Sequence, residues 1–312
     1  MDEKLKISWV IPCFNEELVI EETFERISNV NKSLNQYLWE IVFIDDGSND
    51  NSKLIIRNLV NNNSNIVLIS LSKNYGHQTA VQAGIDYVDS NAVIIIDSDL
   101  QDPPEIAIDM VNKWMEGYEV VYGLRINRDS ETFFKKTSAK LFYRFLNFLS
   151  NTKIPVDTGD FRLIDKKIVL ALRKMPEKGR YLRGLISWAG FKQTEVSYFR
   201  DKRYAGKSKY PLKKMIKLAL EGITSFSTKP LRIATLIGLF SSFISIILML
   251  YILYVRFFTD VWVTGWAGLA LIILFMGGIQ LICMGIIGEY LGKVFIESKN
   301  RPLYFIDEIT KK

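Results

Sequence analysis

The pattern of apolar positions divides the chain into two unlike parts. Up to about residue 228, short apolar runs alternate with amphipathic stretches, whereas residues 231–288 are almost wholly apolar. Helical spacing occurs between the short runs, near residues 16–29, 52–62 and 77–88. The runs themselves are rich in β-branched residues and cover residues 7–11, 41–44, 66–70 and 92–96. Buried runs that alternate with helices in this way predict an α/β fold with a mainly parallel sheet.

The pattern is less regular after the fourth run. Pro103 and Pro104 predict the start of a helix, because proline suits the first helical turn. Beyond it the pattern predicts strands at 119–122 and 191–199, a strand or turn at 160–164, and a long helix over 130–150. We therefore expect residues 1–210 to form one α/β domain.

Two uncharged apolar runs, residues 233–255 and 261–287, dominate the C-terminal part. Each is long enough to cross about 30 Å of hydrocarbon as a helix. Residues 231–288 are therefore predicted to form a two-helix transmembrane hairpin. Residues 211–230 precede it, with an apolar stripe and several lysines, and are predicted to form an amphipathic helix at the membrane interface. An ordinary core helix is the alternative for that segment.

Charge distribution predicts the orientation of this hairpin. Ten Lys/Arg and two acidic residues lie between Arg200 and Arg232, whereas the five-residue link between the spans carries only Arg256 and Asp260. The positive-inside rule then places both termini in the cytoplasm, including a juxtamembrane segment at 289–312. The basic run before the first span also predicts attraction to anionic lipid in the plasma membrane.

Several classes of function are disfavoured. The two cysteines, Cys13 and Cys283, match neither a disulfide framework nor a metal-ligand spacing, so we expect a reducing cytoplasm. No Gly-x-Gly-x-x-Gly follows the first strand, and the chain has no Walker-type loop. The chain runs from its first residues straight into a strand, which predicts no signal peptide. No nucleic-acid partner is expected for a net charge of +6 concentrated beside the membrane.

Acidic and polar residues follow three of the predicted strands, at 12–16, 45–48 and 97–101. Ligands bind at the carboxyl ends of strands in parallel sheets. The repulsion between Asp97 and Asp99 predicts a cation beside them, and Mg²⁺ or Mn²⁺ would take oxygen ligands and bridge to phosphates. The carboxylates at 45 and 46 are candidates for hydrogen bonds to a base or a ribose, with an ordinary turn and helix cap as the alternative.

Six short segments follow one another along the chain: Val10-Ile11-Pro12-Cys13-Phe14-Asn15-Glu16, Asp45-Asp46-Gly47-Ser48, Ser72-Lys73-Asn74-Tyr75-Gly76, Asp97-Ser98-Asp99-Leu100-Gln101-Asp102-Pro103-Pro104, Gly159-Asp160-Phe161-Arg162-Leu163 and Arg203-Tyr204-Ala205-Gly206-Lys207-Ser208-Lys209-Tyr210. In this order they resemble family 2 glycosyltransferases with a GT-A fold. Together with the two spans they are similar to the bactoprenol glucosyltransferase branch, which is akin to dolichol-phosphate mannose synthase.

The resemblance implies a role for each matching residue. Asp160 matches the catalytic base, and Asp99 with Gln101 the metal site. The nucleotide-sugar would be held by Pro12, Phe14, Glu16, Asp45, Asp46, Lys73, Asp97 and Ser98. Phosphates, including that of the lipid, would be held by Arg125, Arg128, Arg203, Lys207 and Ser208. His77 is the only histidine of the chain, and no catalytic role is expected for it.

The implied reaction is an inverting, metal-dependent transfer of a hexose from a UDP-sugar to undecaprenyl phosphate, for glycosylation of the cell envelope. Glucose and N-acetylglucosamine are the expected sugars, with mannose or a modified arabinose as alternatives. A phosphate acceptor is already ionised at neutral pH, so the reaction does not strictly need a base. The alternative role for Asp160 is to orient the acceptor, the metal or a sugar hydroxyl. The lipid bilayer, a homo-oligomer such as a tetramer, and a separate flippase are the expected partners.

Three other functions fit less well. A processive polysaccharide synthase would carry Gln-x-x-Arg-Trp after the base, whereas residues 180–185 read Arg-Tyr-Leu-Arg-Gly-Leu. A non-catalytic scaffold would not need the acidic residues that this chain retains. A transporter would need a pathway, and two spans without an internal charge offer none.

Overall fold

The computed structural model describes residues 4–126, 158–199, 227–258 and 265–312. The chain folds as two compact units. Of the described residues, one unit contains residues 4–126, 158–199 and 302–312, and the other contains residues 227–258 and 265–301. The last residues of the chain therefore belong to the same unit as the N-terminal strands.

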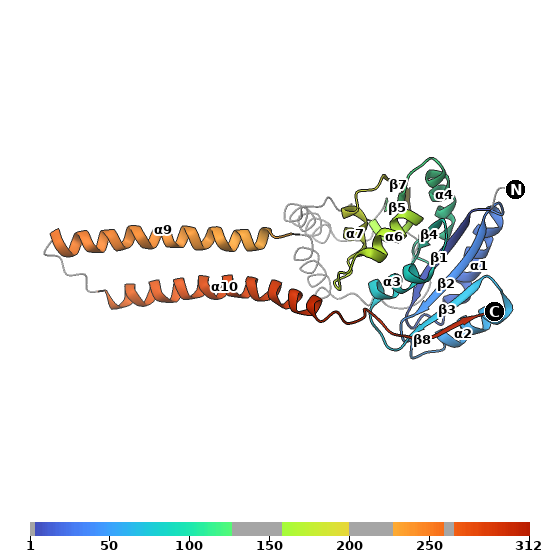
Figure 1. Cartoon of the computed structure of the whole chain (residues 1–312), viewed down its shortest axis with the longest axis horizontal. Coiled ribbons are helices and arrows are strands. Elements are labelled where there is room, and N and C mark those ends of the chain that lie inside the picture. Colours follow the sequence, from blue (N-terminus) through green and yellow to red (C-terminus); the bar gives the residue numbers. More distant parts are fainter. Residues whose placement is uncertain (1–3, 127–157, 200–226, 259–264) are drawn as a thin grey trace. The chain divides into compact units, whose positions relative to one another are not determined.

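The first unit is built on one sheet, whose described strands lie in the order β7-β5-β6-β4-β1-β2-β3-β8 (Figure 1). β1 pairs in parallel with β2 and β4, β2 with β3, and β5 with β7, whereas β6 and β8 are antiparallel to their neighbours. The predicted α/β fold with a mainly parallel sheet is confirmed. The strands are β1 (Lys6–Cys13), β2 (Leu38–Asp45), β3 (Ile66–Leu71), β4 (Ala92–Ile95), β5 (Val120–Arg125), β6 (Thr158–Asp165), β7 (Gln193–Tyr198) and β8 (Ile306–Lys311).

Successive side chains of the central strands point to opposite faces of the sheet and therefore meet different helices. Trp9 and Phe43 belong to the core shared with α1, α2 and α4. Val10 and Ile44 face α3 instead, so closely that a Cβ at Gly84 would lie 2.5 Å from a Val10 methyl. The helices of this unit are α1 (Ile20–Ser33), α2 (Ser52–Asn62), α3 (His77–Tyr87), the 3₁₀ turn η1 (Pro104–Ile106), α4 (Ala107–Met115), α6 (Lys166–Lys174) and α7 (Leu182–Trp188).

The last strand is the main feature that the sequence did not predict. β8 covers the outer edge of β3, and Ser72 N donates a hydrogen bond to Phe305 O at 3.0 Å. Lys53 and Arg57 of α2 form ion pairs with the strand, Lys53 with Asp307 at 3.2 Å and Arg57 with Glu308. The C-terminal segment is therefore part of the sheet and does not merely flank the membrane.

The second unit contains two long apolar helices, α9 (Lys229–Phe258) and α10 (Trp266–Ser298). By length and composition, residues 229–255 and 272–298 can each cross a membrane. α10 extends well beyond the uncharged run predicted for it, because the helix continues through the charged residues Glu289 and Lys293. The predicted interfacial helix at 211–230 lies almost wholly outside the described residues.

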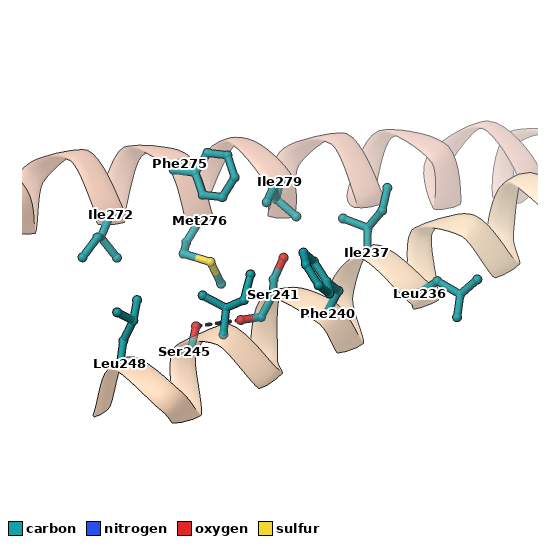
Figure 2. Close-up of a pocket in the computed structure, with 11 residues that line it drawn as sticks. Leu236, Ile237, Phe240, Ser241, Ser245, Leu248, Ile272, Phe275, Met276 and Ile279 are labelled. Carbon is teal, nitrogen blue, oxygen red and sulfur yellow. Dashed lines mark hydrogen bonds between the residues drawn. The ribbon is translucent and has the colours of Figure 1, made fainter. Parts of the chain in front are cut away.

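The two helices enclose an apolar groove of about 480 Å³ along their facing sides (Figure 2). Leu248 of α9 points toward Ile272 of α10 across it, and Met276 of α10 points toward α9. The hydroxyl of Ser245 donates to the carbonyl oxygen of Ser241 at 2.9 Å. This serine hydroxyl therefore needs no outside partner, as hydrocarbon surroundings demand.

Candidate functional site

A pocket of about 430 Å³ lies at the carboxyl ends of β2 and β3. Of the eight residues predicted to bind the nucleotide-sugar, Phe14, Asp45 and Lys73 line it. The rest of its lining is supplied by Gly47, Ser48, Asn49, Lys53, Leu71, Ser72 and Asn74. The pocket combines an aromatic ring, a carboxylate, amides and two lysines, which suits a ligand with a planar base and charged or hydroxylated parts.

Gly47 allows the two loops of this pocket to touch. Its φ angle is +69°, and a Cβ there would lie 2.6 Å from the carbonyl carbon of Lys73 and 2.8 Å from Asn74 N. Any other residue would be strained in this backbone conformation and would also push against backbone atoms. The glycine in the Asp-Asp-Gly-Ser segment is therefore required by the shape of the pocket.

The two adjacent carboxylates of that segment have different surroundings. Asp46 accepts hydrogen bonds from Tyr75 N at 2.7 Å and Gly76 N at 2.9 Å, which orders the loop before α3. Its burial raises the pKa of Asp46, although these hydrogen bonds oppose the shift. Asp45 lines the pocket and accepts a hydrogen bond from Ser48 N at 3.2 Å. We therefore interpret Asp45 as the nucleotide-facing carboxylate and Asp46 as a support for the neighbouring loop.

The other predicted nucleotide residues do not line this pocket. Ser98 Oγ donates to Pro12 O at 3.2 Å and so joins the ends of β4 and β1. Glu16 N donates to Ser52 Oγ at 2.9 Å, which anchors the loop after β1 to the start of α2. These contacts hold the strand ends together, and direct contact of these residues with a nucleotide stays a prediction.

The predicted metal residues, Asp99 and Gln101, share one tight turn after β4. Leu100 between them has a φ of +56°, and Gln101 N donates to Asp99 Oδ1 at 3.2 Å. A carboxylate and an amide are oxygen donors of the kind that Mg²⁺ and Mn²⁺ prefer. In the described part of the chain no three His, Cys, Asp or Glu residues form a metal cage. The turn fits a cation that takes its other ligands from phosphates and water.

Asp160, predicted as the base, accepts hydrogen bonds from three side chains. Arg183 Nε donates to Asp160 Oδ1 at 2.7 Å, and Gln78 Nε2 donates to Oδ2 at 3.0 Å. His77 Nε2 also lies 3.0 Å from Oδ2. Arg183 and Gln78 are themselves held, since Arg183 donates to Thr158 O at 2.7 Å and Gln78 accepts from Leu182 N at 3.1 Å. The carboxylate is thus fixed between α3, β6 and α7.

These contacts determine the charges in the cluster. Burial alone would raise the pKa of Asp160, but Arg183 and His77 hold it well below its usual range. Burial raises the pKa of Asp97 to about 6, although the charge of His77 opposes the shift. A carboxylate with so low a pKa is a poor proton acceptor, and the hydrogen bonds from Arg183 and Gln78 hold it in one orientation.

Arg125, predicted to hold a phosphate, lies in a buried network. Its guanidinium donates to Asp102 Oδ2 at 2.8 Å and to the hydroxyl of Tyr198 at 3.1 Å. A Cβ at Gly159 would lie 2.5 Å from the same guanidinium. Arg125 therefore supports the strand that carries Asp160, and phosphate binding by it stays a prediction. The other predicted phosphate residues, Arg128, Arg203, Lys207 and Ser208, lie outside the described residues.

Comparison with known proteins identifies the family. The family model described as glycosyl transferase family 2 matches residues 8–173, more than half of the chain. The chain belongs to glycosyl transferase family 2. The matched segment contains the pocket residues, Asp99, Gln101 and Asp160, and its sheet is that of the GT-A-like α/β fold expected from the sequence.

Relatives match the chain over almost its full length. An uncharacterized glycosyltransferase, YkcC of Bacillus subtilis, is 47% identical and covers 99% of this chain and 95% of its own. The bactoprenol glucosyl transferase of Shigella phage SfV is 40% identical and covers 99% of this chain and 100% of its own. A solved glucosyl-3-phosphoglycerate synthase of Mycobacterium tuberculosis, in complex with Mn²⁺, UDP and phosphoglyceric acid, is 17% identical with a TM-score of 0.47, covering 70% of this chain and 76% of its own.

Several residues to which the sequence assigned no role contact Asp160 or line the pocket. His77 and Gln78 follow the end of β3, so the rule that ligands bind at strand ends was the signal that could have found them. Lys53 lies in the first turn of α2, next to the pocket. Arg183 had no local signal, because only the packing of α7 beside β6 brings it to Asp160.

Proposed function

We propose that the protein transfers glucose from UDP-glucose to a polyprenyl phosphate, with inversion at the anomeric carbon. The observation that carries this proposal is the 40% identity, over the whole chain, to relatives named bactoprenol glucosyl transferase. That match includes the two apolar helices as well as the catalytic unit. Glucose is favoured over N-acetylglucosamine on the same ground, and mannose or a modified arabinose remain the alternatives.

The donor would occupy the pocket at the ends of β2 and β3. Phe14, Asp45 and Lys73 line this pocket. There Phe14 would stack on the uracil, Asp45 would accept hydrogen bonds from the base or ribose, and Lys73 would pair with negative charge on the donor. Asp99 and Gln101 would hold a Mg²⁺ or Mn²⁺ ion beside the diphosphate. When bound, the ion supplies positive charge that stabilises the departing UDP.

The acceptor phosphate needs little help from a base. The second pKa of a phosphate monoester is near 6, so its oxygen is largely ionised at neutral pH. Asp160, held by Arg183 and Gln78, would orient a sugar hydroxyl or the acceptor and would not remove a proton. One direct displacement of UDP then inverts the anomeric centre and turns a UDP-α-sugar into a β-linked lipid product.

Chain connectivity supports a cytoplasmic active site. The strand that follows the second helix, β8, pairs with β3 of the catalytic sheet. If both helices span, the chain must cross the membrane twice and return to the side on which it began. By the positive-inside rule, the Lys/Arg-rich flanks favour the cytoplasm as that side. A homo-oligomer and a separate flippase stay predictions.

The reaction is tested by supplying radiolabelled UDP-glucose or UDP-N-acetylglucosamine to the purified protein with undecaprenyl phosphate in detergent. We expect labelled lipid with glucose in the presence of Mg²⁺ or Mn²⁺. We expect none with EDTA, and a loss of about a hundredfold or more for Asp99→Asn, because the cation site loses a charge. Lipid labelling that survives both treatments would contradict the metal assignment. An absence of labelling together with an absence of UDP-glucose binding would contradict the transferase proposal.

Substitution of Gly47 tests the assignment of the nucleotide pocket. Gly47→Ala is expected to weaken UDP binding by at least about tenfold, because the new methyl group strains the turn and separates the two loops. Isothermal titration calorimetry measures the affinity directly. Gly117→Ala is the matched control, since Gly117 also has a positive φ of +90° but open space around its Cβ position. Equal UDP affinity for the two variants would place the nucleotide elsewhere.

A further inference from the structure

The single histidine of the chain lies between two carboxylates from different strands. His77 is the first residue of α3, and its Nε2 atom is 3.0 Å from Asp160 Oδ2 and 3.5 Å from Asp97 Oδ1. Asp97 follows β4 and Asp160 lies within β6, the neighbouring strand of the sheet. The imidazole therefore connects the end of β4, which carries the Asp-Ser-Asp segment, to the Asp160 cluster.

His77 is not required merely to orient Asp160. Arg183 and Gln78 already donate hydrogen bonds to both oxygens of that carboxylate. Asp97 has a different environment, since its Oδ1 atom is buried and accepts no hydrogen bond from the described residues. Within the same part of the chain, His77 forms the ion pair with that oxygen. The contribution specific to His77 is therefore to tie Asp97 to Asp160.

The charges around the imidazole favour its protonated form. It contacts the carboxylates of Asp97 and Asp160, and the charges of Asp46 and Arg183 also act on this cluster. Burial lowers the pKa of His77, but the charges of Asp97 and Asp160 outweigh it and raise the pKa to about 9. Without a cation between them, two carboxylates this close would repel each other. The histidine supplies that cation from the protein itself.

We propose that His77 is a positioning residue of the transfer reaction, whose imidazolium bridges Asp97 and Asp160 and so aligns the donor-side carboxylate with the acceptor-side carboxylate. This inference rests on the proposed function, which supplies the donor for Asp97 and the acceptor for Asp160. The bridge contributes alignment more than affinity, because Phe14, Asp45 and Lys73 of the donor pocket lie outside the His77 cluster.

Kinetics of three variants test the bridge. His77→Gln keeps a hydrogen-bond donor without the charge, and we expect kcat to fall about 10- to 100-fold with the KM for UDP-glucose within about threefold. His77→Lys restores a cation, and its kcat is expected to be at least about threefold higher than that of His77→Gln. Gln78→Met removes a neutral donor to Asp160 and is expected to cost less than His77→Gln. A His77→Gln rate within twofold of wild type, or a lysine variant no faster than the glutamine variant, would overturn the proposal.

A spectroscopic measurement tests the bridge without requiring turnover. The full chain has one histidine, so protein labelled with ¹³C-histidine and freed of any histidine tag gives one imidazole signal in detergent. In metal-free protein we expect it to titrate above about pH 8, and at least about one unit lower in Asp97→Asn. An unchanged titration in Asp97→Asn would refute the bridge. If wild type neither labels lipid nor binds UDP-glucose while this shift is present, the proposed function fails and the bridge stands.

Discussion

Replacement of Asp160 by asparagine is expected to lower kcat for lipid glycosylation by at least about a hundredfold. The change is nearly isosteric but removes the negative charge between Arg183 and His77, and it turns one oxygen acceptor into a donor that faces other donors. The affinity for UDP-glucose should stay within about threefold, because Asp160 does not line the nucleotide pocket. Steady-state transfer assays that vary each substrate in turn measure both quantities.

The pH dependence of the same reaction distinguishes an orienting carboxylate from a base. Because the pKa of Asp160 is held well below its usual range, the group stays ionised throughout the neutral range and should add no titration between about pH 6 and 8. The exposed Asp109→Asn variant on α4 is the control for a surface change of the same chemistry. The base role would be correct if the wild-type rate rises with pH through a pKa near 7 and the Asp160→Asn rate does not.

Replacement of Arg125 by methionine is expected to be the most destabilising of the changes considered. Asp102 is 1% exposed, and its carboxylate would lose its guanidinium partner while remaining buried. Removal of one partner from a buried ion pair costs about 3–5 kcal/mol. For a unit of this size each kcal/mol lowers Tm by roughly 2–4 °C. Melting followed by tryptophan fluorescence in detergent reports the change, since Trp9 is fully buried in the core.

Two controls show which role of Arg125 is correct. Tyr198→Phe removes a neutral group from the same network and should cost only about 1 kcal/mol. Its hydroxyl donates to Asp102 at 2.5 Å, and the guanidinium of Arg125 remains to pair with that carboxylate. An Arg125→Met variant that melts like wild type but has a raised KM for undecaprenyl phosphate would establish the phosphate-binding role instead.

The central predictions from the sequence were confirmed because they depend on local chemistry that repeats along the chain. Each of the four apolar runs became a strand of the sheet, and the acidic segments after them lie at the carboxyl ends of β1, β2 and β4. A parallel sheet brings such ends together whatever the loops between them do. The positions of the Asp-Ser-Asp turn and of the Asp-Asp-Gly-Ser loop were predictable for this reason, whereas the two apolar helices were predictable from their length and composition.

The roles of individual residues were less predictable. Asp45 and Asp46 are adjacent and chemically identical, yet one lines a pocket and the other binds two backbone amides. The direction of each side chain depends on strand pairing and on the loop from β3, which the local pattern does not contain. The position of His77 between Asp97 and Asp160 was unpredictable for the same reason, since these two partners are 20 and 83 residues away in the chain.

By itself the sequence determined the α/β domain, the two candidate spans, the positions of the acidic turns and the family. These features follow from hydrophobic period, segment length and short motifs, all of which act over a few residues. Only the tertiary structure decided that β8 closes the sheet beside β3, that Arg183 and His77 surround Asp160, and that Arg125 pairs with Asp102. Those contacts join residues distant in the chain, and their energies come from the burial and charge pairing that folding creates.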